Sequence, residues 1–232
     1  MLLVDRSFHI RTFLNSGAVT ISSTGRFITS TNYTQIAGST LVDGTLSTTG
    51  SAIMNIQGGT LGGTGIINGN VVIAGTMMPG DAPGALTIFG NYEQTNTGTF
   101  DERMGPSSQS LLIVNGNVVL DPGASLEITL LNGFNPLGQT FDIMDYANLS
   151  GEFANGPSFW DDDYLWDVTY GQNQIDVTAV QAPEPSSFLL PALGSFTLSA
   201  FVKQKKVARK RTVESSTDLF HEPDRMHIRS SC

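Results

Sequence analysis

The segment 67–73 reads Ile67-Asn-Gly-Asn-Val-Val-Ile73, and it recurs at 114–120 as Val114-Asn-Gly-Asn-Val-Val-Leu120. A shorter copy, Ile88-Phe-Gly-Asn-Tyr92, lies between them, so that the Gly-Asn pairs begin at positions 69, 90 and 116. Self-similarity at steps of 21 and 26 residues indicates a repeat architecture. Glycine and asparagine tolerate the positive φ of sharp corners, and the flanking valines and isoleucines favour short strands.

A second motif accompanies the first, with a small residue two positions before a leucine. It occurs as Ser39-Thr-Leu41, Gly44-Thr-Leu46, Gly59-Thr-Leu61 and Gly84-Ala-Leu86. Each copy is expected to be a turn residue followed by a strand with one inward leucine. The two motifs predict a parallel β-helix over residues 14–120, with coils of about 20 residues and no long helix. An antiparallel sandwich is the alternative, because Asn-Gly also forms hairpin turns.

The glycine-rich part of this region resembles the passenger repeats of autotransporter adhesins. The resemblance covers residues 38–155 and rests on two stretches: Ile56-Gln-Gly-Gly-Thr-Leu-Gly-Gly-Thr-Gly-Ile-Ile-Asn-Gly-Asn70 and Pro79-Gly-Asp-Ala-Pro-Gly-Ala-Leu86. Passenger domains of that class are right-handed parallel β-helices. The resemblance therefore implies an all-β fold of that hand.

Alternation of apolar and polar residues distinguishes the region 121–181. It is clear in Ala124-Ser-Leu-Glu-Ile-Thr-Leu-Leu131, in Phe141-Asp-Ile-Met-Asp-Tyr146 and in Gln174-Ile-Asp-Val-Thr-Ala-Val180. Half-buried strands of this kind are typical of antiparallel sheets, so 121–181 is predicted to form a β cap over the last coil. Phe159, Trp160 and Trp166 are expected to plug that end. Residues 1–13 are expected to be a poorly ordered start.

The stretch 182–211 combines three features in a fixed order. Pro183-Glu184-Pro185 is a stiff, extended tripeptide, and Phe188–Val202 follows with fifteen uncharged residues. The third feature is a basic run made of Lys203, Lys205, Lys206, Arg209, Lys210 and Arg211. Fifteen helical residues extend about 22 Å, less than the roughly 30 Å of a bilayer core. A short transmembrane helix at 188–202 is predicted, with the basic run as its cytoplasmic stop.

This order resembles the PEP-CTERM sorting signal of Gram-negative bacteria, which a membrane transpeptidase called exosortase recognises. The resemblance implies an exosortase-like partner, transient anchoring in the inner membrane and delivery to the cell surface or extracellular matrix. Twenty-one further residues, Thr212–Cys232, follow the basic run, and their mixed charges predict a disordered tail. Residues 1–13 contain no secretory signal. Either the native start lies upstream of Met1, which is the expectation, or the protein is not exported.

The charge is divided between the two parts of the chain. Before Lys203 there are four arginines, no lysine and 17 acidic residues, a formal charge of −13, whereas the rest carries +4. A body with four arginines and no lysine is expected to bind nucleic acid poorly, because neutralising phosphates needs clustered lysines and arginines. The single cysteine, Cys232, permits neither an intrachain disulfide nor a cysteine-based metal site.

Few residues suggest chemistry, and no cofactor is implied. Asp101-Glu102-Arg103 is the one charged cluster within 14–120, and a charged loop explains it as well as a catalytic site does. Asp161, Asp162 and Asp163 are weak candidates for calcium ligands, because they lack the glycine spacing of calcium loops. The sequence therefore predicts a non-enzymatic exported surface or matrix protein, with surface polysaccharide as a candidate partner. The alternatives are a polysaccharide-acting β-helix enzyme and a sugar-binding module.

Overall fold

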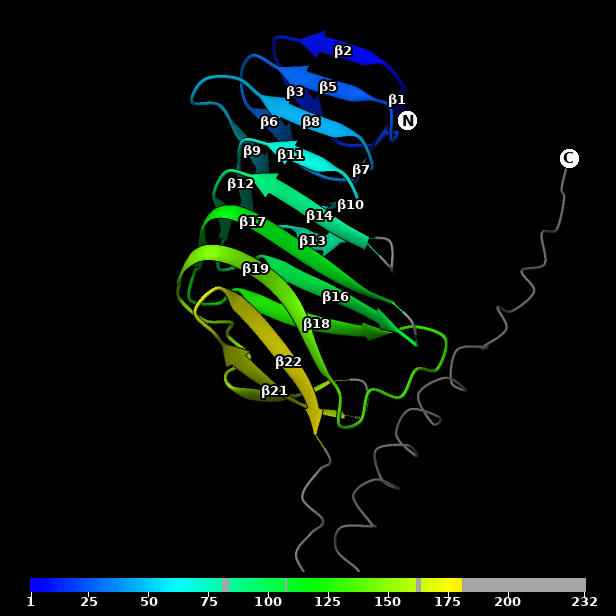
Figure 1. Cartoon of the computed structure of the whole chain (residues 1–232). Coiled ribbons are helices and arrows are strands. Elements are labelled where there is room, and N and C mark those ends of the chain that lie inside the picture. The colour runs from blue at the N-terminus through cyan, green and yellow to red at the C-terminus, as the bar shows by residue number, and fades with distance from the viewer. Residues whose placement is uncertain (81–83, 107, 162–163, 181–232) are drawn as a thin grey trace, which may run out of the picture. The chain divides into compact units, whose positions relative to one another are not determined.

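The computed structural model describes residues 1–80, 84–106, 108–161 and 164–180, and all regular secondary structure in these ranges is β. Most strands pair in parallel with a strand from the next pass of the chain, so that the chain stacks upon itself from the N-terminus onward (Figure 1). The prediction of an all-β chain without a long helix over 14–120 is confirmed for the described residues.

The stack has three faces, and each pass of the chain adds one strand to each. The first face contains β1 (Leu2–Val4), β4 (Ala18–Ile21), β7 (Ser39–Val42), β10 (Thr60–Gly63), β13 (Thr76–Pro79), β16 (Thr99–Gly105) and β18 (Ser125–Leu130). The second contains β2 (Ser7–Ile10), β5 (Arg26–Thr29), β8 (Thr45–Thr48), β11 (Ile66–Asn68), β14 (Gly84–Phe89), the first part of β17 (Ser108–Leu120) and β19 (Thr140–Ser150). The third contains β3 (Phe13–Asn15), β6 (Tyr33–Gln35), β9 (Ile53–Ile56), β12 (Asn70–Ile73), β15 (Tyr92–Gln94), the last part of β17 and the last residues of β19, which pair with it.

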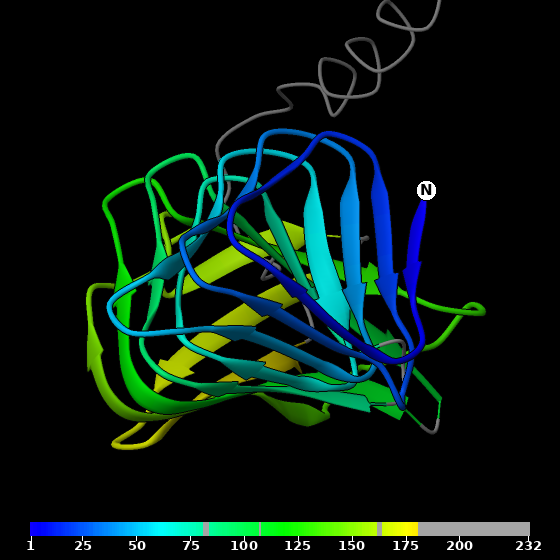
Figure 2. The same ribbon diagram turned by 90° about the horizontal axis from the view of Figure 1, so that it is seen from above.

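The register between coils follows the repeats. Val71 pairs with Tyr92 and Tyr92 with Val118, which are steps of 21 and 26 residues. Figure 2 looks along the stack and shows the coils lying over one another around a common interior. Because these pairings are parallel, the solenoid arrangement holds in this region and the antiparallel sandwich does not.

The interior consists of columns of apolar side chains that run from coil to coil. One column on the second face contains Phe27, Leu46, Ile67, Ile88 and Val114, all buried and each in register with the next. A matching column runs through the third face. Each such side chain contributes about 1.5–3 kcal/mol when it leaves water, so the columns supply the main stabilisation of the stack.

One of the four predicted inward leucines points the other way. Leu46, Leu61 and Leu86 are buried, but Leu61 is in register with Thr40, and Leu41 is only half-buried on the outside. A buried polar cluster explains why a threonine is tolerated here. The Thr40 hydroxyl donates to Gln35 Oε1 at 2.6 Å and lies 2.6 Å from the Tyr33 hydroxyl. Asn15 also donates to Gln35 Oε1, at 3.1 Å, so this cluster satisfies its own hydrogen bonds.

The first thirteen residues belong to the solenoid. β1 pairs with β4, β2 with β5 and β3 with β6, all in parallel. The expected poorly ordered start is therefore wrong, because these residues form the first coil and Val4 is buried in the interior. The polar residues Asp5, Arg6 and His9, which obscured the pattern, are exposed.

The parallel part also extends further than residue 120. β18 pairs in parallel with β16, and β19 in parallel with β17, so antiparallel pairing was wrong for residues 125–130. The antiparallel sheet begins where β19 meets β22 (Gln174–Val180). It continues through β21 (Tyr164–Tyr170) to β20 (Ser158–Asp161). Ile175, Val177 and Ala179, which alternate with polar residues in 174–180, are buried.

The aromatic residues of this end differ in their burial. Trp166 is fully buried and its ring is tilted against that of Phe141, Phe159 is half-buried, and Trp160 is 61% exposed. The expectation that all three plug the end is wrong for Trp160. It lies next to Phe159 on β20, and neighbouring residues of a strand point to opposite sides.

Side chains cover the last edge of the first face. Asn155 Oδ1 accepts from the Leu126 N–H at 2.8 Å, and Asn155 Nδ2 donates to the Leu126 carbonyl at 2.9 Å. Asp161 Oδ2 accepts from the Ile128 N–H at 2.8 Å. These side chains take the hydrogen bonds that another strand would make, which leaves β18 a protected edge.

Candidate functional site

The predicted sorting residues lie outside the described part of the chain. This applies to Pro183, Glu184 and Pro185, to the helix predicted at 188–202, and to the basic residues Lys203, Lys205, Lys206, Arg209, Lys210 and Arg211. Within the described ranges, no helix is long and apolar enough to span a bilayer.

The aspartates considered as calcium ligands are not assembled into a site in the described residues. Asp161 uses one carboxylate oxygen to accept from the Ile128 N–H on β18, while Asp162 and Asp163 lie outside the described part. Among the described residues, no group of three or more histidine, cysteine, aspartate or glutamate side chains is placed to hold a metal ion. The observed role of Asp161 is therefore to cover a strand edge.

The charged triplet at 101–103 forms part of strand β16 instead of a loop. Asp101 faces outward and accepts from the Thr129 hydroxyl at 2.8 Å, whereas Glu102 points inward and is fully buried. Glu102 Oε1 accepts from the Ser110 N–H at 3.0 Å, and Oε2 has no partner among the described residues. Burial raises the pKa of Glu102 well above 4.5, although the Ser110 hydrogen bond lowers it.

Asp142 on β19 is a second carboxyl group with a perturbed pKa. Its pKa is raised to about 6. Burial is the main cause, and the negative charges of Asp145 and Asp176 contribute to the same rise. Its charge also contributes to the raised pKa of Glu102. The two groups therefore retain protons at pH values where ordinary carboxyl groups have lost them.

A row of exposed asparagines runs along the edge of the third face, and we call it the asparagine ladder: Asn32, Asn70, Asn91, Asn117 and Asn148. The Oδ1 atoms of Asn70 and Asn91 each accept from the backbone N–H of the next asparagine, both at 2.9 Å. Asn117 Oδ1 accepts from Asn148 Nδ2 at 2.9 Å. Asn32 Oδ1 accepts from the Ile53 N–H at 3.0 Å, and the apolar Ile53 interrupts the ladder. The ladder thus adds side-chain hydrogen bonds between successive coils.

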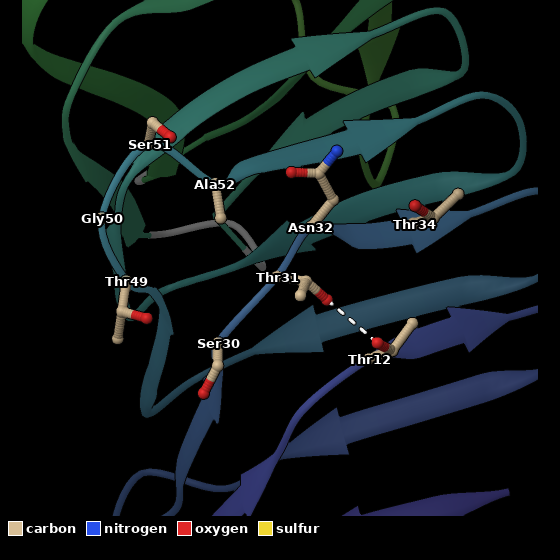
Figure 3. A pocket seen from close by; sticks show the side chains of 9 residues that line it. All are labelled: Thr12, Ser30, Thr31, Asn32, Thr34, Thr49, Gly50, Ser51 and Ala52. Atoms are coloured by element: carbon tan, nitrogen blue, oxygen red, sulfur yellow. Dashed lines mark hydrogen bonds between the residues drawn. The ribbon is translucent and has the colours of Figure 1, made fainter.

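A concavity of about 720 Å³ lies where the chain turns from the second face to the third (Figure 3). Its lining, which we call the hydroxyl basin, comprises Thr12, Ser30, Thr31, Asn32, Thr34 and residues 49–52. All side chains of the basin are uncharged, and seven of the nine carry a hydroxyl or an amide group. This concavity was not foreseen from the sequence, because serines and threonines at corners also fit ordinary turns.

Hydrogen bonds within the protein fix the residues that line the basin. The Thr31 hydroxyl donates to the Arg11 carbonyl at 2.6 Å and lies 3.2 Å from the Thr12 hydroxyl (Figure 3). The Thr48 hydroxyl, behind the wall, donates to the Ala52 carbonyl at 2.9 Å. The backbone that bears the hydroxyls of the basin is therefore fixed by hydrogen bonds within the solenoid.

A second concavity of about 300 Å³ continues along the same face. Its lining includes Ile53, the ladder residues Asn70, Asn91 and Asn117, and the outward side chains of Val72, Glu93 and Val119. The two linings adjoin in the sequence, where Ala52 of the basin is followed by Ile53 of the second concavity. We call the two concavities together the polar groove. Glu93 is the one charged side chain in the lining formed by the described residues.

The polar groove can exchange hydrogen bonds with an uncharged polar ligand along several coils. Part of it was visible in the sequence, since the repeat steps of 21 and 26 align Asn70 with Asn91 and Asn117. They also align Val72 with Val119, and both are half-buried on the outer face, on either side of Glu93. No family model matches this chain, and no curated protein matches it.

Proposed function

We propose that this chain is a non-enzymatic exported protein of the cell surface or extracellular matrix, with the solenoid as its working part. The observation that carries this proposal is the asparagine ladder. Asn70, Asn91 and Asn117 use their side-chain oxygens to hold one coil to the next. Hydrogen bonds from the outward side chains of one coil to the next coil stiffen the solenoid along its axis. A stiff solenoid of this kind suits a protein that presents a binding surface outside the cell.

The hand of the coil and the role of its last strands belong to the same proposal. A right-handed β-helix is the expected form, since crossover connections between parallel strands are right-handed in about 98% of cases. The antiparallel strands β20, β21 and β22 then act as a cap, which the Asn155 hydrogen bonds to β18 support. A cap at this end opposes end-to-end association of solenoids.

A sugar-binding role is the second candidate, and the polar groove favours it over hydrolysis. Acid–base cleavage of a glycosidic bond typically uses two carboxyl groups that flank the bond, about 5–9.5 Å apart. The groove lining contributes the single carboxylate of Glu93, whereas Glu102 is in the interior. The geometry therefore favours binding over the alternative of a polysaccharide-acting enzyme.

Delivery to the surface is the part of the proposal that rests on the sequence. In it, an exosortase-like transpeptidase recognises Pro183-Glu184-Pro185 and removes the helix at 188–202 and the basic run. The tripeptide suits recognition because its extended backbone loses little conformational freedom on binding. Glu184 provides a negative charge between two rigid prolines, which the enzyme can recognise.

The test is to express the chain with a secretory signal peptide in a host that carries the sorting enzyme. The mature protein is isolated from the cell surface and its mass is measured. We expect the wild-type product to end near Pro185, and Glu184→Ala to accumulate uncut in the membrane. Glu152→Ala, which changes an exposed glutamate of the solenoid, is the matched control and should be processed normally. Full-length wild-type protein at the surface would refute the sorting role.

A further inference from the structure

The hydroxyl basin contains side chains whose hydrogen bonding is incomplete. The hydroxyls of Ser30, Thr34, Thr49 and Ser51 form no hydrogen bond within the described residues, although each lines the concavity. Figure 3 shows these side chains arranged around the same corner of the stack. They are free to bond a ligand, while the wall behind them is fixed by the hydrogen bonds of Thr31 and Thr48. Such a site loses little freedom on binding.

The polar groove extends this surface along the solenoid axis. Its lining runs from Thr12, beside β3, to Val119 on β17, and so crosses six successive strands of the third face. With about 4.8 Å between neighbouring strands, five spacings give a length of about 24 Å. The asparagines that line it use Oδ1 within the ladder, and the Nδ2 groups of Asn70 and Asn91 have no acceptor among the described residues. The groove therefore fits an elongated chain better than a single small molecule.

The charges of the chain decide what kind of polymer can lie there. The described residues that line the groove include no positive side chain, and residues 1–202 carry a formal charge of −13. A field of that sign repels acidic polymers. Val72 and Val119 offer small apolar surfaces on either side of Glu93, where the less polar face of a sugar ring can pack.

We propose that the polar groove binds a linear, uncharged polysaccharide that lies along the solenoid axis. The hydroxyl basin bonds to sugar hydroxyls, and the amides of the asparagine ladder donate further hydrogen bonds along the chain. This inference names a partner for the surface that the proposed function displays. It does not depend on how the protein reaches the surface.

The test uses the purified full chain and calorimetric titration with neutral linear oligosaccharides, namely maltoheptaose, cellohexaose, laminarihexaose, mannohexaose and xylohexaose. Polygalacturonate serves as the acidic probe. Thr34→Val with Ser51→Ala removes two free hydroxyls of the basin at nearly constant shape. The control, Thr20→Val with Ser16→Ala, changes a half-buried threonine and an exposed serine elsewhere on the coils. Circular dichroism verifies that both variants keep the β fold.

We expect at least one neutral oligosaccharide to bind, with a dissociation constant about tenfold higher in the basin variant and unchanged in the control. Ser51→Leu, which fills part of the basin from an exposed position, should weaken binding as well. Binding of none of the neutral probes overturns the proposal, and so does preference for polygalacturonate. Binding that survives the basin variants but is lost in Trp160→Ala also overturns it and places the sugar at that exposed tryptophan. None of these results bears on processing at Pro183-Glu184-Pro185, so failure here is distinguishable from failure of the sorting role.

Discussion

The Asn91 side chain bonds to the next coil, because its Oδ1 accepts from the backbone N–H of Asn117 at 2.9 Å. The backbone N–H of Asn91 donates in turn to Oδ1 of Asn70 in the preceding coil, also at 2.9 Å. Asn91→Ala leaves the Asn117 N–H without this partner. We expect a loss of about 1 kcal/mol in the free energy of unfolding, measured by urea titration. Asn96→Ala is the matched control, because Asn96 is exposed and its side chain makes no hydrogen bond among the described residues. Equal losses in the two variants would show that the ladder contributes nothing specific.

Glycines of successive coils lie close together at another corner of the solenoid. Gly59 has φ +73°, and a Cβ atom there would lie 2.0 Å from the Gly38 carbonyl oxygen. Gly50 has a similar φ of +65° but open space around its Cβ position. Gly50→Ala should cost about 1–2 kcal/mol from backbone strain alone. Gly59→Ala should cost at least about 2 kcal/mol more, because two coils must move apart.

The difference between the two glycine variants is measured by thermal and urea unfolding. It separates close contact between coils from conformational preference, since both positions need positive φ. Similar losses in Gly50→Ala and Gly59→Ala would contradict the close stacking of Gly38 and Gly59.

The repeat itself could be predicted from the sequence, and so could part of its register. The Gly-Asn pairs at 69, 90 and 116 gave the correct alignment of Asn70, Asn91 and Asn117, because a corner needs the same residues in every coil. Leu41 was assigned to the wrong side, since a shift of one residue reverses every side chain of a strand. The buried Gln35–Thr40 hydrogen bond, which favours the observed register, joins residues that no repeat links.

Two other features could not be read from local patterns. Alternation in 125–130 indicates a half-buried strand, but it does not distinguish a parallel neighbour from an antiparallel one, so the end of the parallel part was placed too early. The buried position of Glu102 was also hidden, because a charged triplet resembles a loop until the register of β16 is known. The hydroxyl basin brings together corners about twenty residues apart that share no distinctive motif.

Glu102 should make the stability of the solenoid depend on pH. Burial raises its pKa well above 4.5, so the folded state binds a proton that the unfolded state releases. The contribution of this proton to the free energy of unfolding is fully present below the pKa of the unfolded state. It is lost as pH rises through the pKa of the folded state. Asp142, with its pKa raised to about 6, acts in the same direction between its ordinary value of 3.8 and about 6. Stability should therefore fall as pH rises from 4 to 8.

Glu102→Gln removes the titrating group while keeping its shape. We expect this variant to be more stable than wild type at pH 8 and to show a flatter dependence of urea midpoint on pH. Glu127→Gln on β18 removes the same charge from an exposed position and is the control for general charge repulsion. A pH profile that Glu102→Gln leaves unchanged would mean that Glu102 titrates normally.

Asn155 should protect the edge of the first face from association. Its side chain bonds both the N–H and the carbonyl of Leu126, at 2.8 and 2.9 Å. Asn155→Ala should lower the free energy of unfolding by about 1–3 kcal/mol and expose the β18 edge. Light scattering during mild heating is expected to show earlier aggregation than in Asn115→Ala, an exposed control on β17. Aggregation at the same temperature in both variants would indicate that Asn155 does not guard this edge.

The ladder and the groove both require that the strands of the third face stack in parallel, one per coil. The most direct measurement joins cysteine pairs with dibromobimane, a short thiol cross-linker, in a Cys232→Ser background, and detects the products by mass spectrometry. Val72 and Glu93 are register partners, as are Glu93 and Val119, whereas Val72 and Val119 are separated by two strand spacings of about 4.8 Å each. Cysteine pairs at 72/93 and at 93/119 should cross-link readily, and the 72/119 pair should not. Efficient cross-linking of 72 to 119, with little between 72 and 93, would mean that 67–73 and 114–120 pair directly, and it would contradict the parallel solenoid.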